Sequence, residues 1–113
     1  MFKELSALTG IMGKLPQIKD EFAKFQAKAG EMTADGAAGG DMVRVTANGK
    51  FMLTKVRLSD EALKLQDKEV LEDLITAASN QALERVRKLL ADEASRVAGE
   101  IGLPPGLSIP GLG

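Results

Sequence analysis

Histidine, cysteine, tryptophan and tyrosine are absent from this chain of 113 residues, and phenylalanine occurs only four times. Without histidine and cysteine there is no Cys/His zinc site, thiolate nucleophile, Ser-His-Asp triad or imidazole base. No disulfide can form, so the fold does not depend on an oxidising compartment. The scarcity of aromatic rings also argues against the base stacking that single-strand nucleic-acid binders use.

Long apolar runs are absent as well. The sequence has no stretch of about 18 consecutive apolar residues, so we expect no membrane-spanning helix. The first residues lack a basic segment followed by a continuous apolar one, so we expect no signal peptide. A cytoplasmic protein is the resulting expectation, and 113 residues suffice for one domain.

An amphipathic helix is predicted either to begin near Leu15, with Pro16 in its first turn, where proline is tolerated, or to kink there after a weaker helical turn. Apolar side chains recur there at alternating spacings of four and three, which places them on one stripe. The stripe consists of Ile11, Leu15, Ile18, Phe22, Phe25, Ala29 and Met32. The Gly-rich residues 34–41 that follow are predicted to form a loop, with a possible short strand over 31–33 before it.

Residues 42–58 are predicted to form a β-hairpin with a type I′ turn at Asn48-Gly49. That turn would place Ala47 opposite Lys50, Val45 opposite Met52 and Val43 opposite Thr54. One face, expected to meet the core, then carries Val43, Val45, Ala47, Met52, Thr54, Val56 and Leu58. The other face mixes cations with Met42, Phe51 and Leu53, so we expect something to cover part of it.

The second half of the chain is predicted to be mostly helical. A short helical turn is expected over 59–63, and Asp67 is a suitable N-cap for a long helix that ends before Gly102. The predicted fold is a single α+β domain over residues 1–102, followed by a Pro/Gly-rich tail over residues 103–113. The domain has a long N-terminal helix, a small antiparallel sheet (the hairpin plus a possible third strand) and a long C-terminal helix.

Two long amphipathic helices flank a sheet that is too small to cover both apolar stripes. A helix of about 32 residues is roughly 48 Å long, about twice the length of an eight-residue strand. A monomer would leave a large apolar patch in water, which soluble monomers avoid. The sequence therefore favours a homodimer.

Carboxylates are the main catalytic groups left to the chain, and their pattern does not indicate an active site. Glu69, Glu72 and Asp73 gather at the start of the long helix, where acidic side chains complement the helix dipole. Asp35 and Asp41 flank the glycines but lack the spacing of a calcium loop. We predict no enzymatic activity, catalytic residue, metal, cofactor or small-molecule substrate.

Positive charge is more informative, although the net charge is only −1. Residues 1–58 hold nine basic and six acidic side chains, or +3, whereas residues 59–113 hold six and ten, or −4. Local clusters of Lys and Arg suit the phosphates of a nucleic acid. We take as candidate DNA-binding residues three such clusters: Lys14, Lys19, Lys24 and Lys28; Arg44, Lys50, Lys55 and Arg57; and Arg85, Arg87, Lys88 and Arg96.

The order of several segments resembles the YbaB/EbfC family of bacterial nucleoid-associated proteins. The resemblance rests on Met1-Phe2, the amphipathic first helix, residues 43–49 (VRVTANG), residues 67–82 (DKEVLEDLITAASNQA) and the LPPG sequence at 103–106. It implies a cytoplasmic homodimer in the nucleoid, with helices that project from a central sheet. It also implies binding to DNA that alters DNA conformation, and no catalytic activity or cofactor.

We therefore expect a dimeric DNA-binding protein that contacts mainly backbone phosphates, with roles in nucleoid organisation and gene regulation. The alternative is a protein–protein interaction module without direct DNA binding, which would use the apolar part of the second sheet face. The acidic second half of the chain favours this alternative.

Overall fold

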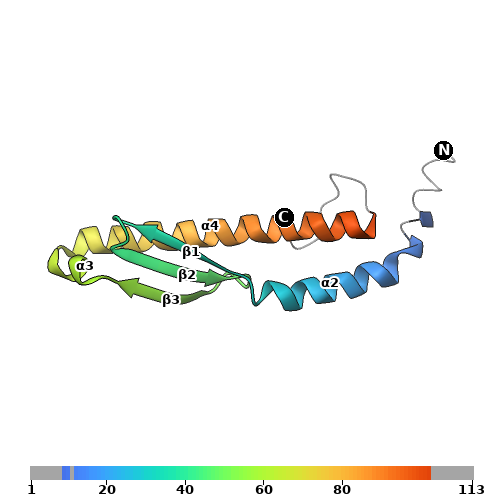
Figure 1. Ribbon diagram of the computed structural model, residues 1–113, viewed down its shortest axis with the longest axis horizontal. Coiled ribbons are helices and arrows are strands. Elements are labelled where there is room, and N and C mark those ends of the chain that lie inside the picture. Colours follow the sequence, from blue (N-terminus) through green and yellow to red (C-terminus); the bar gives the residue numbers. More distant parts are fainter. Residues whose placement is uncertain (1–8, 11, 103–113) are drawn as a thin grey trace. The chain divides into compact units, whose positions relative to one another are not determined.

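The computed structural model describes residues 9–10 and 12–102. Its elements are α2 (Leu15–Ala29), β1 (Thr33–Ala38), β2 (Val43–Asn48), β3 (Leu53–Leu58), α3 (Asp60–Lys64) and α4 (Lys68–Ile101), as Figure 1 shows. This order confirms the predicted α+β fold with a long helix at each end of a small antiparallel sheet. The predicted tail over 103–113 and Ile11 of the first stripe lie outside the described residues.

Within the chain, contacts group the residues into two units. One comprises residues 29–90, with the sheet, α3 and α4 as far as Leu90. The other comprises residues 1–28 and 91–113, and within it α2 and the end of α4 are described. The 34 residues of α4 correspond to a length of about 51 Å.

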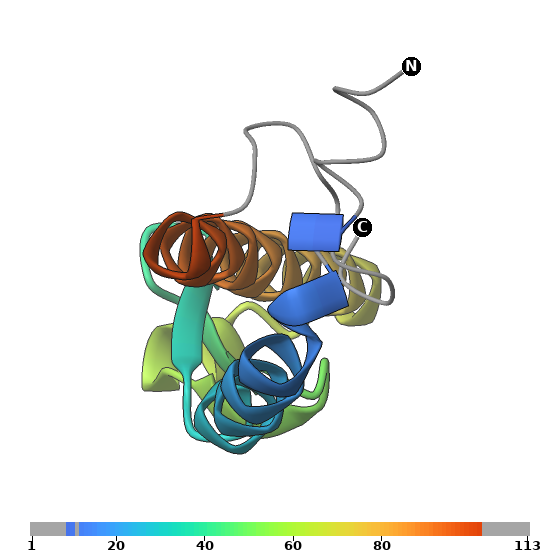
Figure 2. The same cartoon turned by 90° about the vertical axis from the view of Figure 1, so that its right-hand side faces the viewer.

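The core of the sheet unit is a thin layer between α4 and β2. Val43, Val45 and Ala47 alternate along β2 and are fully buried. Val45 lies opposite Gly36, which contacts α4, so these side chains face the helix, where Ala78, Ala82 and Val86 are also fully buried. Figures 1 and 2 show α4 running along the sheet. A Cβ atom at Gly36 in β1 would collide with the backbone of Ala78 and Ala82. Small residues therefore bring the helix and the sheet into backbone contact.

The prediction of a loop over residues 34–41 was wrong, because most of this segment belongs to strand β1. Residues Thr33–Ala38 form β1, which pairs antiparallel with β2 and places Gly36 opposite Val45. Small residues have low strand propensity, but in this sheet they are the only ones that allow α4 to lie so close. Tertiary packing thus overrides the local preference for a turn, which occupies only residues 39–42.

The predicted hairpin is confirmed, but its turn and register were wrong. The connection comprises residues 49–52, and the register pairs Val43 with Leu58 and Val45 with Val56. The side chain of Asn48 accepts hydrogen bonds from the N–H groups of Lys50 (2.9 Å) and Met52 (3.2 Å).

Gly49 does not form a type I′ turn. It lies where the backbone comes close to Ala29 and Met32. Its N–H donates to the carbonyl of Met32 (2.9 Å), and a Cβ there would collide with the carbonyl of Ala29. In the connection between β2 and β3, Phe51 and not Gly49 has the left-handed backbone conformation, with φ of 59°.

The observed register differs from the predicted one by an even number of residues, so most residues lie on the face of the sheet that was predicted for them. Val56 and Leu58 share the face of Val45 and Val43, and Lys55 and Arg57 occupy the opposite one. A bulge next to Ala47 brings Leu53 opposite that residue, away from its predicted face. Val56 and Leu58 are nevertheless exposed, because every residue of β3 lies beyond the cover that α4 provides.

The boundaries of α3 and α4 agree closely with the prediction, and the Asp67 cap is confirmed. The Ser59 hydroxyl accepts the N–H of Ala62 (3.1 Å) at the start of α3, and the Asp67 carboxylate accepts the N–H of Val70 (3.2 Å) at the start of α4. Pro16 lies in the first turn of α2, and residues 9–10 and 12–13 before this helix are also helical. Phe25 and Ala29 of the stripe are buried. Met32 lies beyond the end of the helix.

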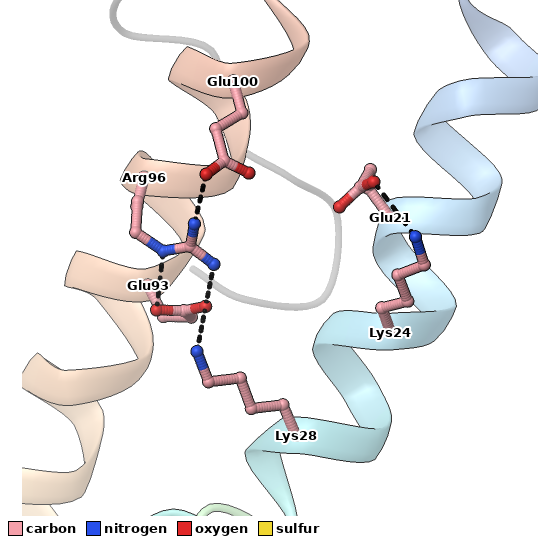
Figure 3. A network of polar contacts seen from close by, with 6 residues as sticks. All are labelled: Glu21, Lys24, Lys28, Glu93, Arg96 and Glu100. Atoms are coloured by element: carbon pink, nitrogen blue, oxygen red, sulfur yellow. Dashed lines mark hydrogen bonds and ion pairs between the residues drawn. The ribbon is translucent and has the colours of Figure 1, made fainter.

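The second unit is held together by apolar packing and by a charge network centred on Glu93. Phe25, Val97 and Ile101 are buried in this unit. Glu93 accepts hydrogen bonds from Arg96, at 2.5 and 3.1 Å, and from Lys28 of α2, at 3.0 Å (Figure 3). Arg96 also pairs with Glu100. These donors, Arg96 first and Lys28 second, lower the pKa of Glu93 from 4.5 to about 2.

The contact between Gly36 and α4 predicts opposite effects for two glycine-to-alanine substitutions. Gly36→Ala should destabilise the fold by about 1–3 kcal/mol, because the added methyl group meets helix backbone that cannot move aside. Gly99→Ala, in α4 with open space around the new methyl group, should stabilise by up to about 1 kcal/mol. Urea unfolding measures both, and a stabilised Gly36→Ala protein would contradict the packing described here.

Glu93 predicts a pH dependence of stability. Because its pKa is lower in the folded state, its ionised form stabilises the fold above about pH 4.5, and this contribution disappears as the pH falls towards 2. Glu93→Gln should therefore lower the urea midpoint at pH 7 and leave it close to wild type near pH 2. Asp92→Asn is the control, and should change little at pH 7. An equal deficit for Glu93→Gln at both pH values would contradict this role.

Candidate nucleic-acid interface

Of the lysines in α2 and Lys14, which precedes this helix, two form ion pairs with carboxylates and two do not. Lys24 lies 3.5 Å from Glu21, and Lys28 lies 3.0 Å from Glu93 (Figure 3). Lys14 and Lys19 form no ion pair with a described residue. Two of the four cations predicted here thus already have a carboxylate partner inside the protein.

Three of the four predicted cations of α4 are bonded to other groups of the protein, compared with two of the four in and before α2. Arg87 binds Glu84 through two hydrogen bonds of 2.6 and 3.0 Å, which lower the pKa of Glu84 and raise the pKa of Arg87. Arg96 belongs to the Glu93 network, and its hydrogen bond with Glu93 raises its pKa. Lys88 is exposed and, among the described residues, has no ion-pair partner.

Arg85 has a structural role that the sequence did not indicate. Its guanidinium donates to the carbonyl of Asp35 in β1 (2.7 Å), while Gln81, one turn earlier, accepts the N–H of Ala37 (2.7 Å). These are backbone groups on the outer edge of β1. Two side chains of α4 therefore close this edge of the sheet against further pairing.

The hairpin carries its four predicted cations on its outer face and in its loop. Arg44 of β2 lies directly opposite Arg57 of β3, and Lys55 lies opposite Thr46. Arg44 is paired with Asp41 (3.1 Å) and Asp35 (3.6 Å). In the described part of the chain, Lys50, Lys55 and Arg57 have no carboxylate partner. Like charges directly opposite each other destabilise a sheet, and the ion pairs of Arg44 with Asp41 and Asp35 offset part of the repulsion between Arg44 and Arg57.

The opposite face and the edge of β3 are apolar and uncovered. Leu53, Val56 and Leu58 are 45%, 46% and 39% exposed, and the preceding Phe51 and Met52 are exposed as well. The N–H of Ser59 donates to Met42 next to β2. Since strand residues alternate, the backbone groups of Val56 and Leu58 point away from β2. No described segment pairs with this edge, in contrast to the closed edge of β1.

A concave feature adjoins two of the predicted cations. A hollow of about 410 Å³ lies at the β1–β2 turn, beside Gly39, Gly40, Arg44 and Arg85. Both of its arginines are already bonded to groups of the protein. Within residues 9–10 and 12–102 there is no cluster of three or more potential metal ligands. No helix in the same ranges is long and apolar enough to span a membrane.

The twelve predicted cations are therefore not gathered into one site. The structure brings Arg44, Lys55 and Arg57 together on one sheet face. Of the eight predicted cations in and before the helices, Lys24, Lys28, Arg87 and Arg96 form salt bridges. For the pairs within one helix, the i,i+3 or i,i+4 spacing is the sequence signal that could have identified them. The long-range pair of Lys28 with Glu93 carries no local sequence signal.

Comparison with known proteins gives consistent matches across the chain. Among curated proteins, a nucleoid-associated protein of Granulibacter bethesdensis is 36% identical over 103 residues, which are 91% of this chain and 96% of that protein. One of Caldanaerobacter subterraneus, TTE0040, is 33% identical over 93% of this chain and 89% of its own length.

A similar fold has been solved by crystallography. The uncharacterized protein HP0035 from Helicobacter pylori superposes with a TM-score of 0.66 and 27% identity, over 79% of this chain and 94% of that one. The sequence model of the YbaB/EbfC DNA-binding family matches residues 4–101, which is nearly the whole chain. The resemblance noted from sequence is thereby confirmed, and the chain belongs to the YbaB/EbfC DNA-binding family.

Proposed function

We propose that this protein binds duplex DNA as a homodimer, mainly through backbone phosphates, and thereby alters DNA conformation in the nucleoid. The observation that carries the proposal is the match to a DNA-binding family over residues 4–101. Relatives over nearly the same length are called nucleoid-associated proteins, which supports a role in nucleoid organisation and gene regulation. The family is defined by DNA binding and not by a reaction, which supports a non-enzymatic role.

Phosphate contact suits the available side chains. Apart from Arg85, which is bonded to the backbone of β1, six of the twelve predicted cations have no carboxylate partner among the described residues and can approach phosphates without first breaking a salt bridge: Lys14, Lys19, Lys50, Lys55, Arg57 and Lys88. Each phosphate neutralised releases bound counterions, which favours binding at low salt whatever the DNA sequence. The chain has no tryptophan or tyrosine for base stacking, and the described structure presents no recognition helix of a helix-turn-helix type.

A second copy of the chain is the partner that best suits β3. The strand offers an open edge and an apolar face together, whereas the edge of β1 is closed by Gln81 and Arg85. In a two-fold symmetric dimer the two β3 strands would pair antiparallel, which is the arrangement that identical edges form. The pairing would satisfy the free backbone groups of Val56 and Leu58 and remove an edge prone to aggregation.

The same apolar surface also favours the alternative of a protein–protein interaction module. In that module Met42, Phe51 and Leu53, the apolar residues predicted on the second sheet face, would contact a different protein instead of a second copy. The two functions differ in one property, because only the DNA-binding protein retards duplex DNA without any added component.

Salt dependence tests the DNA-binding function. The purified protein should bind random-sequence duplex DNA with an affinity that falls steeply with salt, with a slope of log K against log salt of about −0.9 for each phosphate contacted. Fluorescence anisotropy at several salt concentrations measures this slope. No binding at low salt, or an affinity that does not change with salt, would refute binding through phosphates.

The dimer is tested by placing a charge on β3. Wild type should have about twice the 12.0 kDa chain mass in light scattering at micromolar concentration. Val56→Glu should reduce this towards the monomer, because a carboxylate would be buried in the paired strands. Val70→Glu is the control, since Val70 is similarly exposed (40% against 46%) but lies in the first turn of α4. A wild-type monomer, or a Val56→Glu dimer of unchanged stability, would exclude this interface.

A further inference from the structure

We propose that Glu93 competes with DNA phosphates for Lys28 of α2 and Arg96 of α4, and thereby limits the affinity of the protein for DNA. The inference rests on the proposed DNA-binding function and adds to it an internal carboxylate that holds binding in check. All three residues belong to the unit that comprises residues 1–28 and 91–113, and Figure 3 shows them together.

One oxygen of the Glu93 carboxylate receives both cations. Oε1 accepts a hydrogen bond from Nζ of Lys28 (3.0 Å) and one from the guanidinium of Arg96 (2.5 Å). Oε2 accepts a second hydrogen bond from Arg96 (3.1 Å). Phosphate oxygens accept charge-assisted hydrogen bonds from lysine and arginine in the same way. Glu93 therefore makes the contacts that a phosphate would make with these two side chains.

The exposure of the three side chains makes this pairing persistent. Lys28 and Arg96 are 55% and 50% exposed, whereas Glu93 is only 11% exposed. In every other ion pair among the described residues, the carboxylate is at least 26% exposed. Salt screens a partly buried pair less than an exposed one. Glu93 therefore keeps its two cations under conditions that weaken the surface pairs.

Glu93 also sets the charge of its surroundings. The network in Figure 3 has three carboxylates and three cations and is neutral as a whole: Glu21, Lys24, Lys28, Glu93, Arg96 and Glu100. Without the charge of Glu93, the cations would outnumber the carboxylates and Lys28 would lose its partner. Affinity for phosphate depends on local charge and on cations that are free to contact it. Neutralising Glu93 should therefore strengthen DNA binding by more than the loss of one negative charge explains.

A double-mutant cycle between Lys28 and Glu93 tests the competition. Wild type, Lys28→Gln, Glu93→Gln and the double variant are compared for binding to a mixed-sequence duplex of about 30 base pairs, by fluorescence anisotropy between about 50 and 300 mM salt. Asp92→Asn is the control for charge, because Asp92 forms no ion pair with a described residue. Lys19→Gln, made with Glu or Gln at position 93, is the control for a cation outside the network.

Glu93→Gln should bind DNA about three- to tenfold more tightly at about 100 mM salt, with a salt slope steeper by about 1 to 2 for each chain that contacts DNA. Asp92→Asn should stay within about twofold of wild type. Lys28→Gln should also change affinity less than about twofold when Glu93 is present, and weaken binding at least about threefold when it is replaced by Gln. Lys19→Gln should weaken binding equally in both backgrounds.

An effect of Lys28→Gln that is the same in both backgrounds would overturn the inference and leave the DNA-binding function intact. A gain for Asp92→Asn as large as that for Glu93→Gln would do the same, since charge alone would then explain it. A wild-type protein that does not bind the duplex would instead refute the proposed function.

Circular dichroism and light scattering check that each variant is folded and has the mass of wild type. If Glu93→Gln does not fold, the comparison with Glu93 present decides. Lys28→Gln should then weaken binding less than Lys19→Gln, because Glu93 already holds Lys28 and not Lys19. An equal or larger loss for Lys28→Gln would refute the competition.

Discussion

The contact between Gly36 and the backbone of Ala78 and Ala82 is the constraint on which the rest of the structure depends. It seats α4 over β1 so closely that no side chain fits between Gly36 and the helix backbone. The helix then covers two strands of a three-stranded sheet, and every residue of β3 is left exposed. The same proximity lets Gln81 and Arg85 reach the backbone of β1 and close that edge. The packing of α4 against β1 therefore leaves the β1 edge of the sheet closed and the β3 edge open.

Charge follows the same division. Five cations of the helices are held by carboxylates: Lys24, Lys68, Arg87 and Arg96 pair within one helix, and Lys28 pairs with Glu93. Of the ten acidic side chains in residues 59–113, Glu72, Glu84, Glu93 and Glu100 have such a cation partner. The hairpin over residues 42–58 contains no carboxylate of its own. Among the described residues, its Lys50, Lys55 and Arg57 have no carboxylate partner, whereas Arg44 pairs with Asp35 and Asp41. The net charge of −1 conceals this difference, because affinity for phosphate depends on local charge.

Local signals in the sequence were sufficient for the helices and insufficient for the sheet. Caps such as Ser59 and Asp67 act within one turn, so pattern alone located α3 and α4. The strand Thr33–Ala38 could not be predicted, because its glycine and alanines are explained by a helix more than 40 residues away in sequence. For the same reason Gly49 was misread as a turn glycine. Of the candidate site, the hairpin cations were identified from sequence, but their freedom from carboxylate partners depends on tertiary contacts.

The edge strand β3 has both an apolar surface, which favours pairing with another strand, and a row of cations, which opposes it. A row of cations normally discourages two edges from pairing, since it protects sheets from aggregation. In β3 the cations occupy one face, while the apolar side chains occupy the other and the backbone groups point outwards. In the proposed homodimer, pairing of two copies would join the sheets edge to edge and gather positive charge on a single face. The repulsion within that face would weaken the dimer alone and would be relieved by a polyanion, so dimerisation and DNA binding should reinforce each other.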